Sequence, residues 1–244
     1  MTSPGPAAAG PARRGRYHHG DLREALIETA IELLGERGAE AFSMAEASRR
    51  LGVAVSAPYR HFADRDALLA AVALRAAGLL AEQLDRSAAS GTPAQRLAAA
   101  ARAYVHFADD QRPLFQALAG SGLSKDSRPE IAAAAQAIGT AFLSPSAELA
   151  SGSETVAARL TSAIVATAHG HAMLMLDGIF GSGRHAAEAA AEEAAAATLA
   201  LIAGRDYLTP PADDHPATQQ ITAPLIPDMP ARPPANPSGL RRVP

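Results

Sequence analysis

The chain has 244 residues, with 22 Lys and Arg against 25 Asp and Glu, a formal net charge of −3, and neither Cys nor Trp. This length suits one domain or two small ones with a sizeable core. The lack of Cys excludes disulfide scaffolds, thiolate zinc sites and cysteine nucleophiles. The near-neutral charge balance gives no sign of a chain that is polybasic throughout.

The N-terminal 16 residues lack the apolar run of a secretory signal peptide. The most apolar stretch, residues 160–180, is interrupted by Ser, Thr, two His and Asp177. This interruption favours a buried helix over a membrane span. We therefore expect a cytoplasmic protein without a membrane partner.

Proline marks the ends of the expected fold. Ten of the 18 prolines lie in residues 210–244, and three more precede residue 12. Because proline lacks a backbone donor and fixes φ, such segments hold neither helices nor central strands. We predict a disordered basic arm over residues 1–16 and a disordered Pro-rich tail over residues 205–244.

Between these ends the apolar residues recur with a helical period, and no stretch shows sustained strand alternation, which predicts an all-α fold. Capping boxes mark helix starts at Asp21–Glu24, Ser43–Glu46, Thr92–Gln95 and Ser127–Glu130. Helices are expected over residues 22–37, 43–51, 55–62, 65–86, 93–109, 112–119, 128–143, 155–177 and 185–203.

The first three helices are short and tightly connected, whereas the later ones are longer and rich in Ala. We place the domain boundary near residue 64. This divides the fold into a three-helix domain over residues 17–64 and a larger helical domain over residues 65–204.

The second and third expected helices have the spacing of a helix-turn-helix. Gly52 permits a left-handed turn between them, and Val53 fills the angle with an apolar side chain. One of Arg49 and Arg50 is expected to meet an acidic residue of the first helix. A recognition helix would present its outer residues to the major groove; the candidate DNA contacts are Ser43, Val55, Ser56, Ala57, Tyr59, Arg60 and His61.

The start of that recognition helix carries two unfavourable residues. Ala54 has no side chain that can cap a helix. Pro58 lacks the N–H that would bond to the Ala54 carbonyl. The regular helix is therefore expected to begin at Val55 or Ser56, with Ser56 as the better cap and a loose first turn.

The run from Tyr17 to Leu69, with Gly-Val at 52–53, Tyr59, Phe62 and the closing Leu68-Leu69, resembles the N-terminal domain of TetR-type transcriptional regulators. The resemblance implies a head that extends to about residue 80. It also implies a homodimer through helices 155–177 and 185–203, bound to a near-palindromic operator in double-stranded DNA. At the family position, Tyr59 is an exposed phosphate contact. Arg14 and Arg16 would then reach the minor groove, or merely solubilise the chain.

Residues 168–170, Ala-His-Gly, lie in a long apolar helix and resemble the subgroup whose C-terminal domain carries a Trp-His-Gly signature, with Ala in place of Trp. The larger domain is expected to bind a small lipophilic effector. Candidate pocket residues are Tyr104, Phe107, Leu114, Phe115, Leu118, Phe142, His169, Met173 and Met175, although ordinary core packing explains many of them equally well.

No enzyme, metal site or cofactor is expected. His169 and His171 lie about 200° apart on a helix, so they cannot share a metal, and His106 with Asp110 supplies only two ligands. Nucleophile-elbow, Walker and Rossmann patterns are absent from the sequence. The sequence therefore predicts a ligand-responsive repressor. The alternative is a helical small-molecule-binding module with a vestigial DNA head.

Overall fold

The computed structural model describes residues 19–39, 41–119 and 129–208. All regular structure within these ranges is helical, as the sequence predicts. The α-helices are α1 (His19–Arg37), α2 (Met44–Leu51), α3 (Arg65–Ser87), α4 (Pro93–Asp110), α5 (Arg112–Ala119), α6 (Pro129–Leu149), α7 (Glu154–Leu176) and α8 (Arg184–Ala203), and two short 3-10 turns are η1 (Pro58–Arg60) and η3 (Arg205–Leu208).

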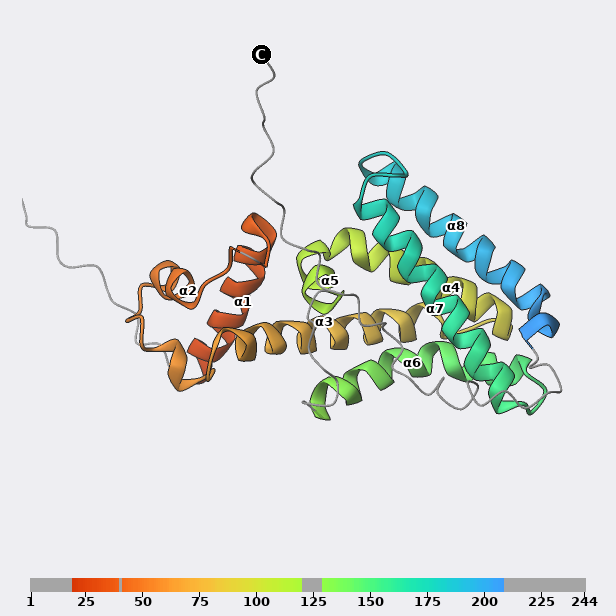
Figure 1. The fold of residues 1–244 in the computed structure, drawn as a ribbon, viewed down its shortest axis with the longest axis horizontal. Helices are drawn as coiled ribbons and strands as arrows, with labels where there is room; N and C mark the ends of the chain where they lie inside the picture. The colour runs from red at the N-terminus through yellow and green to blue at the C-terminus, as the bar shows by residue number, and fades with distance from the viewer. Residues whose placement is uncertain (1–18, 40, 120–128, 209–244) are drawn as a thin grey trace, which may run out of the picture.

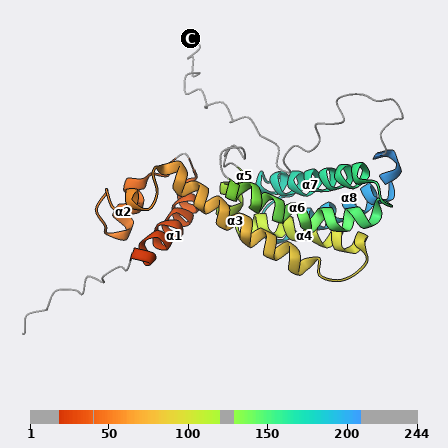
Figure 2. The ribbon, with the colours of Figure 1, turned by 90° about the horizontal axis from the view of Figure 1, so that it is seen from below.

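The molecule has a small head and a larger body (Figures 1 and 2). The head contains α1, α2 and the segment that leads through η1 to α3. The body contains α4 to α8, in which α8 packs on α4 and α7, and α6 packs on α3, α4 and α7. Helix α3 starts in the head and runs into the body, so it belongs to both (Figure 1).

The body core combines large aromatic residues with many alanines. Phe107, Phe115 and Phe142 are fully buried. One stripe of α8 is buried within the subunit, which lets its backbone approach α4 and α7 closely; its members are Ala186, Ala187, Ala190, Ala191, Ala194 and Ala195. Helix α3 is long and apolar enough to cross a membrane, but half of its apolar window is buried inside the protein, as in a core helix.

The prediction of a recognition helix over residues 55–62 is wrong. The chain forms only η1 there, and Ala57 rather than Ser56 stands at its N-cap, without a side-chain hydrogen bond. Pro58 cannot donate to a carbonyl one turn earlier, and a turn over residues 54–57 takes up the chain before it.

Two other helix boundaries differ from prediction. Helix α1 begins at His19, so Asp21 lies within the helix and not at its start. Helix α6 continues through Pro145 to Leu149, six residues beyond the expected end. Packing of α6 on α3, α4 and α7 offsets the hydrogen bond that Pro145 cannot donate.

The predicted capping boxes have three further outcomes. Thr92 and Gln95 form the complete reciprocal box at the start of α4. Ser43 caps α2 by accepting a hydrogen bond from the backbone N–H of Glu46. Ser127 of the box at Ser127–Glu130 lies outside the described ranges, and so does the predicted arm. At the start of the predicted disordered tail, Arg205–Leu208 form η3, which contacts α7 and α8. The rest of the tail lies outside the described ranges.

Candidate functional site

The connection between α2 and η1 is built from consecutive hydrogen-bonded turns. Gly52 ends α2 in the left-handed region, at φ 66°, and the N–H of Val53 donates to the Ser48 carbonyl over 3.0 Å. This is the usual way in which a glycine closes a helix. A turn then places the Ala57 N–H 2.8 Å from the Ala54 carbonyl.

The same segment is anchored to the head by its C-terminal half. Pro58 and Phe62 are buried, and the backbone N–H of Phe62 donates to the Pro58 carbonyl over 3.0 Å. The guanidinium of Arg23 on α1 lies 5.2 Å from the centre of the Phe62 ring. Arg65, at the start of α3, donates to the Phe42 carbonyl over 3.2 Å. These contacts hold the turn in one position.

On this anchored segment, most of the candidate DNA contacts are exposed. The exposed fractions are 54% for Val55 and 52% for Tyr59. Ser56, Arg60 and the capping Ser43 are also exposed, while Ala57 and His61 are half-buried. Arg14 and Arg16 lie outside the described residues. The head therefore places a short, mixed polar and apolar surface at the end of the molecule away from the body (Figures 1 and 2).

The three arginines of this region have different surroundings. Arg50 forms a two-pronged pair with Glu36 of α1, both N–O distances being 2.7 Å, as predicted for one of the two helix arginines. This hydrogen bonding lowers the pKa of the Glu36 carboxyl and raises that of Arg50. Arg49 pairs with Glu46 on its own helix. Arg60 makes no ion pair with any described residue, which leaves its charge available to a phosphate.

In the body, the structure brings three candidate pocket residues together. The Tyr104 hydroxyl lies 3.1 Å from Nδ1 of His169, and the Phe115 ring packs edge-on against Tyr104 at 5.7 Å. Burial raises the pKa of Tyr104 and lowers that of His169, so both side chains favour their neutral forms. A neutral His169 protonated on Nε2 can accept the Tyr104 hydrogen bond at Nδ1.

The other pocket candidates belong to the same apolar core. Five of them, Phe107, Leu114, Leu118, Phe142 and Met175, are buried, and Met173 packs against the core in part. His171 does not join His169, because its Nδ1 lies 2.8 Å from the Thr167 carbonyl and its ring lies beside Phe180. Within the described ranges, no group of three or more His, Asp or Glu side chains is placed to hold a metal ion.

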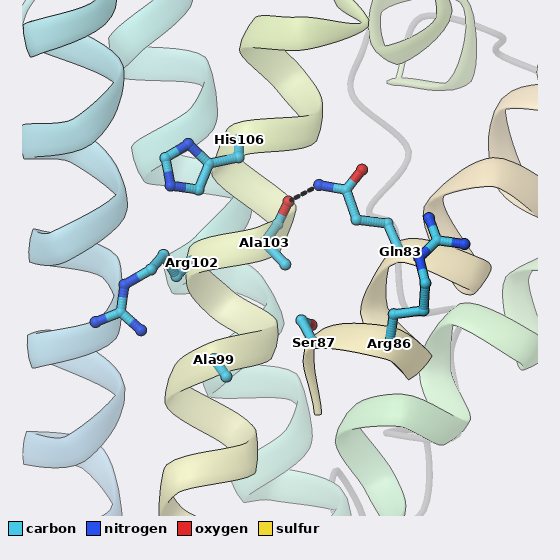
Figure 3. Close-up of a pocket in the computed structure, with 7 residues that line it drawn as sticks. All are labelled: Gln83, Arg86, Ser87, Ala99, Arg102, Ala103 and His106. Atoms are coloured by element: carbon cyan, nitrogen blue, oxygen red, sulfur yellow. Dashed lines mark hydrogen bonds between the residues drawn. The ribbon is translucent and has the colours of Figure 1, made fainter. Parts of the chain in front are cut away.

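An open groove of about 400 Å³ lies between α3 and α4, and sequence reasoning missed it. Figure 3 shows its small floor residues, Ala99 and Ala103, and the Gln83 amide that donates to the Ala103 carbonyl over 3.0 Å. Arg102 turns away towards α8, where it pairs with Glu192 at 2.6 Å. The complete lining is Gln83, Arg86, Ser87, Ala99, Arg102, Ala103 and His106. None of the pocket residues predicted from sequence lines this groove.

Sequence reasoning also missed the contacts that join head and body. Arg75 of α3 reaches back to Glu28 of α1 at 2.7 Å and also contacts Glu24. A sequence signal did exist, since Arg75 is the one charge between Asp66 and Glu82 in an apolar run. A second contact lies between Gly35 of α1 and the Pro113 ring of α5, and no local pattern predicts it.

Two protein-family models match the chain. The model described as bacterial regulatory proteins, tetR family, matches residues 26–72, which include α2, η1 and the start of α3. The model described as tetracyclin repressor-like, C-terminal domain, matches residues 97–199 of the body. Among curated proteins, none matches this chain.

Several solved structures are similar to this one. A protein of unknown function from Rhodococcus sp. RHA1 is 28% identical, with a TM-score of 0.64 over 75% of this chain and 96% of its own. The TetR-family regulator PfmR of Thermus thermophilus is 21% identical, with a TM-score of 0.55 over 72% and 96%. A TetR/AcrR-family regulator of Thermobifida fusca is 23% identical, with a TM-score of 0.54 over 73% and 97%. At these identities the last two demonstrate a shared fold.

Proposed function

Because the chain belongs to the TetR family of bacterial regulatory proteins, and is therefore a DNA-binding transcriptional regulator rather than an enzyme, we propose that it is a ligand-responsive repressor. A small lipophilic effector releases it from a near-palindromic operator. It acts in the cytoplasm, where its DNA is. One observation carries this proposal: α3 is a single helix that starts beside the DNA-contacting turn and ends in the body.

On the DNA side, the exposed segment around η1 enters the major groove. Tyr59 and Arg60 contact phosphates, because both residues are exposed and Arg60 makes no ion pair with a described residue. Ser43, Val55, Ser56, Ala57 and His61 complete the surface. Arg14 and Arg16 of the arm reach the neighbouring minor groove.

Dimerisation sets the spacing of two such surfaces. The outer faces of α7 and α8 carry small or apolar exposed residues, among them Ser162, Ala166, Leu174, Ala196 and Leu199. In a homodimer these faces form a four-helix bundle with their copies. The two recognition segments then lie about 34–36 Å apart, one turn of DNA.

The effector binds in the body beside Tyr104 and His169. These two side chains form a hydrogen-bonded polar pair inside an otherwise apolar core. A few polar groups in apolar surroundings are typical of sites for lipophilic small molecules. A ligand that favours a different spacing of the heads shifts the population towards that spacing and releases the DNA.

Footprinting on genomic fragments around the gene tests this proposal. The purified protein should protect one near-palindromic site, sediment as a dimer, and lose the footprint when an effector from a lipophilic library is added. Tyr59→Ala should weaken the complex about 10- to 100-fold, because an exposed phosphate contact is lost. Leu143→Ala, an exposed change on α6 in the body, is the matched control and should bind normally.

The same experiment decides between the repressor and the alternative of a small-molecule-binding module with a vestigial head. A module of that kind would bind lipophilic ligands, displacing the dye Nile red from the body, yet show one weak mode on every duplex. A monomeric protein that binds every duplex equally weakly would contradict the repressor hypothesis. A site-specific complex that Tyr59→Ala abolishes would contradict the module.

A further inference from the structure

The tip of the DNA-contacting segment is an unusual place for a branched apolar side chain. Val55 and Ser56 are the two central residues of the turn that the Ala57 N–H closes onto the Ala54 carbonyl. Gly, Asn, Asp, Ser and Pro predominate at such positions, and a β-branched residue has no conformational advantage there. The conformation of the turn therefore does not explain why a valine stands at position 55.

Packing within the described residues does not explain it either. The Val55 side chain is 54% exposed, and it is absent from the apolar core that includes Phe42, Met44 and Phe62. Among the described residues that precede α3, Val55 and Tyr59 are the two large hydrophobic residues that are exposed. Tyr59 has a hydroxyl that water or a phosphate satisfies, whereas Val55 offers only its two methyl groups.

The backbone beneath Val55 holds this apolar group in place. Gly52 and Val53 close α2 on one side, and buried Pro58 begins η1 on the other. An apolar contact held in advance loses little conformational entropy when it forms. Of the neighbouring exposed side chains, Ser56, Tyr59 and Arg60 carry polar groups and Ala54 carries a single methyl group, so Val55 is the largest wholly apolar point on this surface.

In the major groove, one base edge complements such a point. Thymine alone of the four bases presents a methyl group, at C5, while the other groups on the edges are hydrogen-bond donors and acceptors. We propose that Val55 determines sequence specificity by packing on a thymine C5-methyl group in each half-site, and that Tyr59 and Arg60 set the register on the phosphates. This inference rests on the proposed function.

The test starts from the sequence that the full-length protein selects from a random duplex library. Each thymine of the selected site is then replaced in turn by deoxyuridine, which removes only the methyl group. At one symmetric pair of positions we expect the affinity of the unaltered protein to fall about 3- to 10-fold per half-site, as befits one buried methyl contact.

Val55→Ala should lower affinity for the thymine site by a similar factor, and deoxyuridine at those positions should cost this variant nothing further. Leu143→Ala, which removes exposed apolar surface from α6 in the body, should respond to deoxyuridine as the unaltered protein does. An unchanged thermal midpoint for Val55→Ala would confirm that the turn is intact, because an exposed side chain adds little to stability.

Two results would overturn the proposal: no thymine whose methyl matters, or a methyl effect of equal size in Val55→Ala. Both can occur while the protein still selects a site, so they leave the repressor intact. If the unaltered protein selects no sequence at all, the proposed function fails, and the role of Val55 fails with it.

Discussion

The head and the body differ in the size of their buried cores. In the body, aromatic residues such as Phe107 and Phe142 are fully buried among alanines. The head has a smaller core, and charged contacts such as Arg50–Glu36 and the Arg23–Phe62 stack fix its parts at the surface. The difference shows that the segment around η1 can be held by a few anchors while most of its own side chains stay exposed.

The largest expected effect concerns the body. Phe142→Ala should lower the free energy of unfolding by about 3–5 kcal/mol, because it removes a fully buried ring from a core that cannot collapse completely. Leu143→Ala, one residue along α6 and 45% exposed, should cost less than about 1 kcal/mol. Urea titration followed by circular dichroism measures both, and equal costs would show that α6 does not bury this face.

Two glycine substitutions test the joint between head and body. A Cβ at Gly35 would lie 3.0 Å from Cγ of Pro113, whereas a Cβ at Gly78 meets nothing within 4 Å. Gly78→Ala should stabilise the protein by about 0.5–1 kcal/mol through helix propensity. Gly35→Ala should forfeit this gain through crowding and end about 1–3 kcal/mol below it. Thermal unfolding compares the pair, and matching gains would mean that α1 and α5 do not touch there.

Two helix caps separate a structural role from a binding role. Thr92 in the body and Ser43 in the head each accept a hydrogen bond from a backbone N–H three residues on, over 3.3 Å and 3.2 Å. Either change to Ala should cost about 1 kcal/mol of stability. Only Ser43→Ala should also weaken operator binding, about 3- to 10-fold, in a gel-shift assay. If the two variants bound the operator with equal affinity, Ser43 would not contact DNA.

The smallest effect is a pH dependence in the body. Burial lowers the pKa of His169, so the unfolded chain takes up a proton at this residue more readily than the folded protein does. His169 therefore contributes stability above its ordinary pKa of about 6.5, and this contribution is lost as the pH falls through the lower folded value. Melting temperatures from about pH 7.5 to about pH 5.5 should fall more steeply for the unaltered protein than for His169→Phe. Parallel curves would contradict this assignment.

Local sequence signals were sufficient for much of the fold. Apolar periodicity placed α3, α4, α5, α7 and α8 to within one residue at each end, because the helical period and caps such as Thr92 act over a few neighbouring residues. The glycine turn at Gly52 was predictable for the same reason, and so were the unfavourable Ala54 and Pro58. The helix-turn-helix spacing and the resemblance to the TetR family identified the candidate residues of the DNA surface. Their contacts with DNA remain a prediction.

Contacts between segments that are far apart in the sequence could be found only from the tertiary structure. Helix α6, which packs on α3, α4 and α7, continues past Pro145, and no neighbouring residue signals this outcome. One of Arg49 and Arg50 was expected to meet an acidic residue of α1. That Arg50 pairs with Glu36 depends on how α1 and α2 cross. The Tyr104–His169 pair joins residues 65 positions apart. Such pairings depend on how the helices pack. Helix caps and apolar periodicity depend only on residues that are near one another in the sequence.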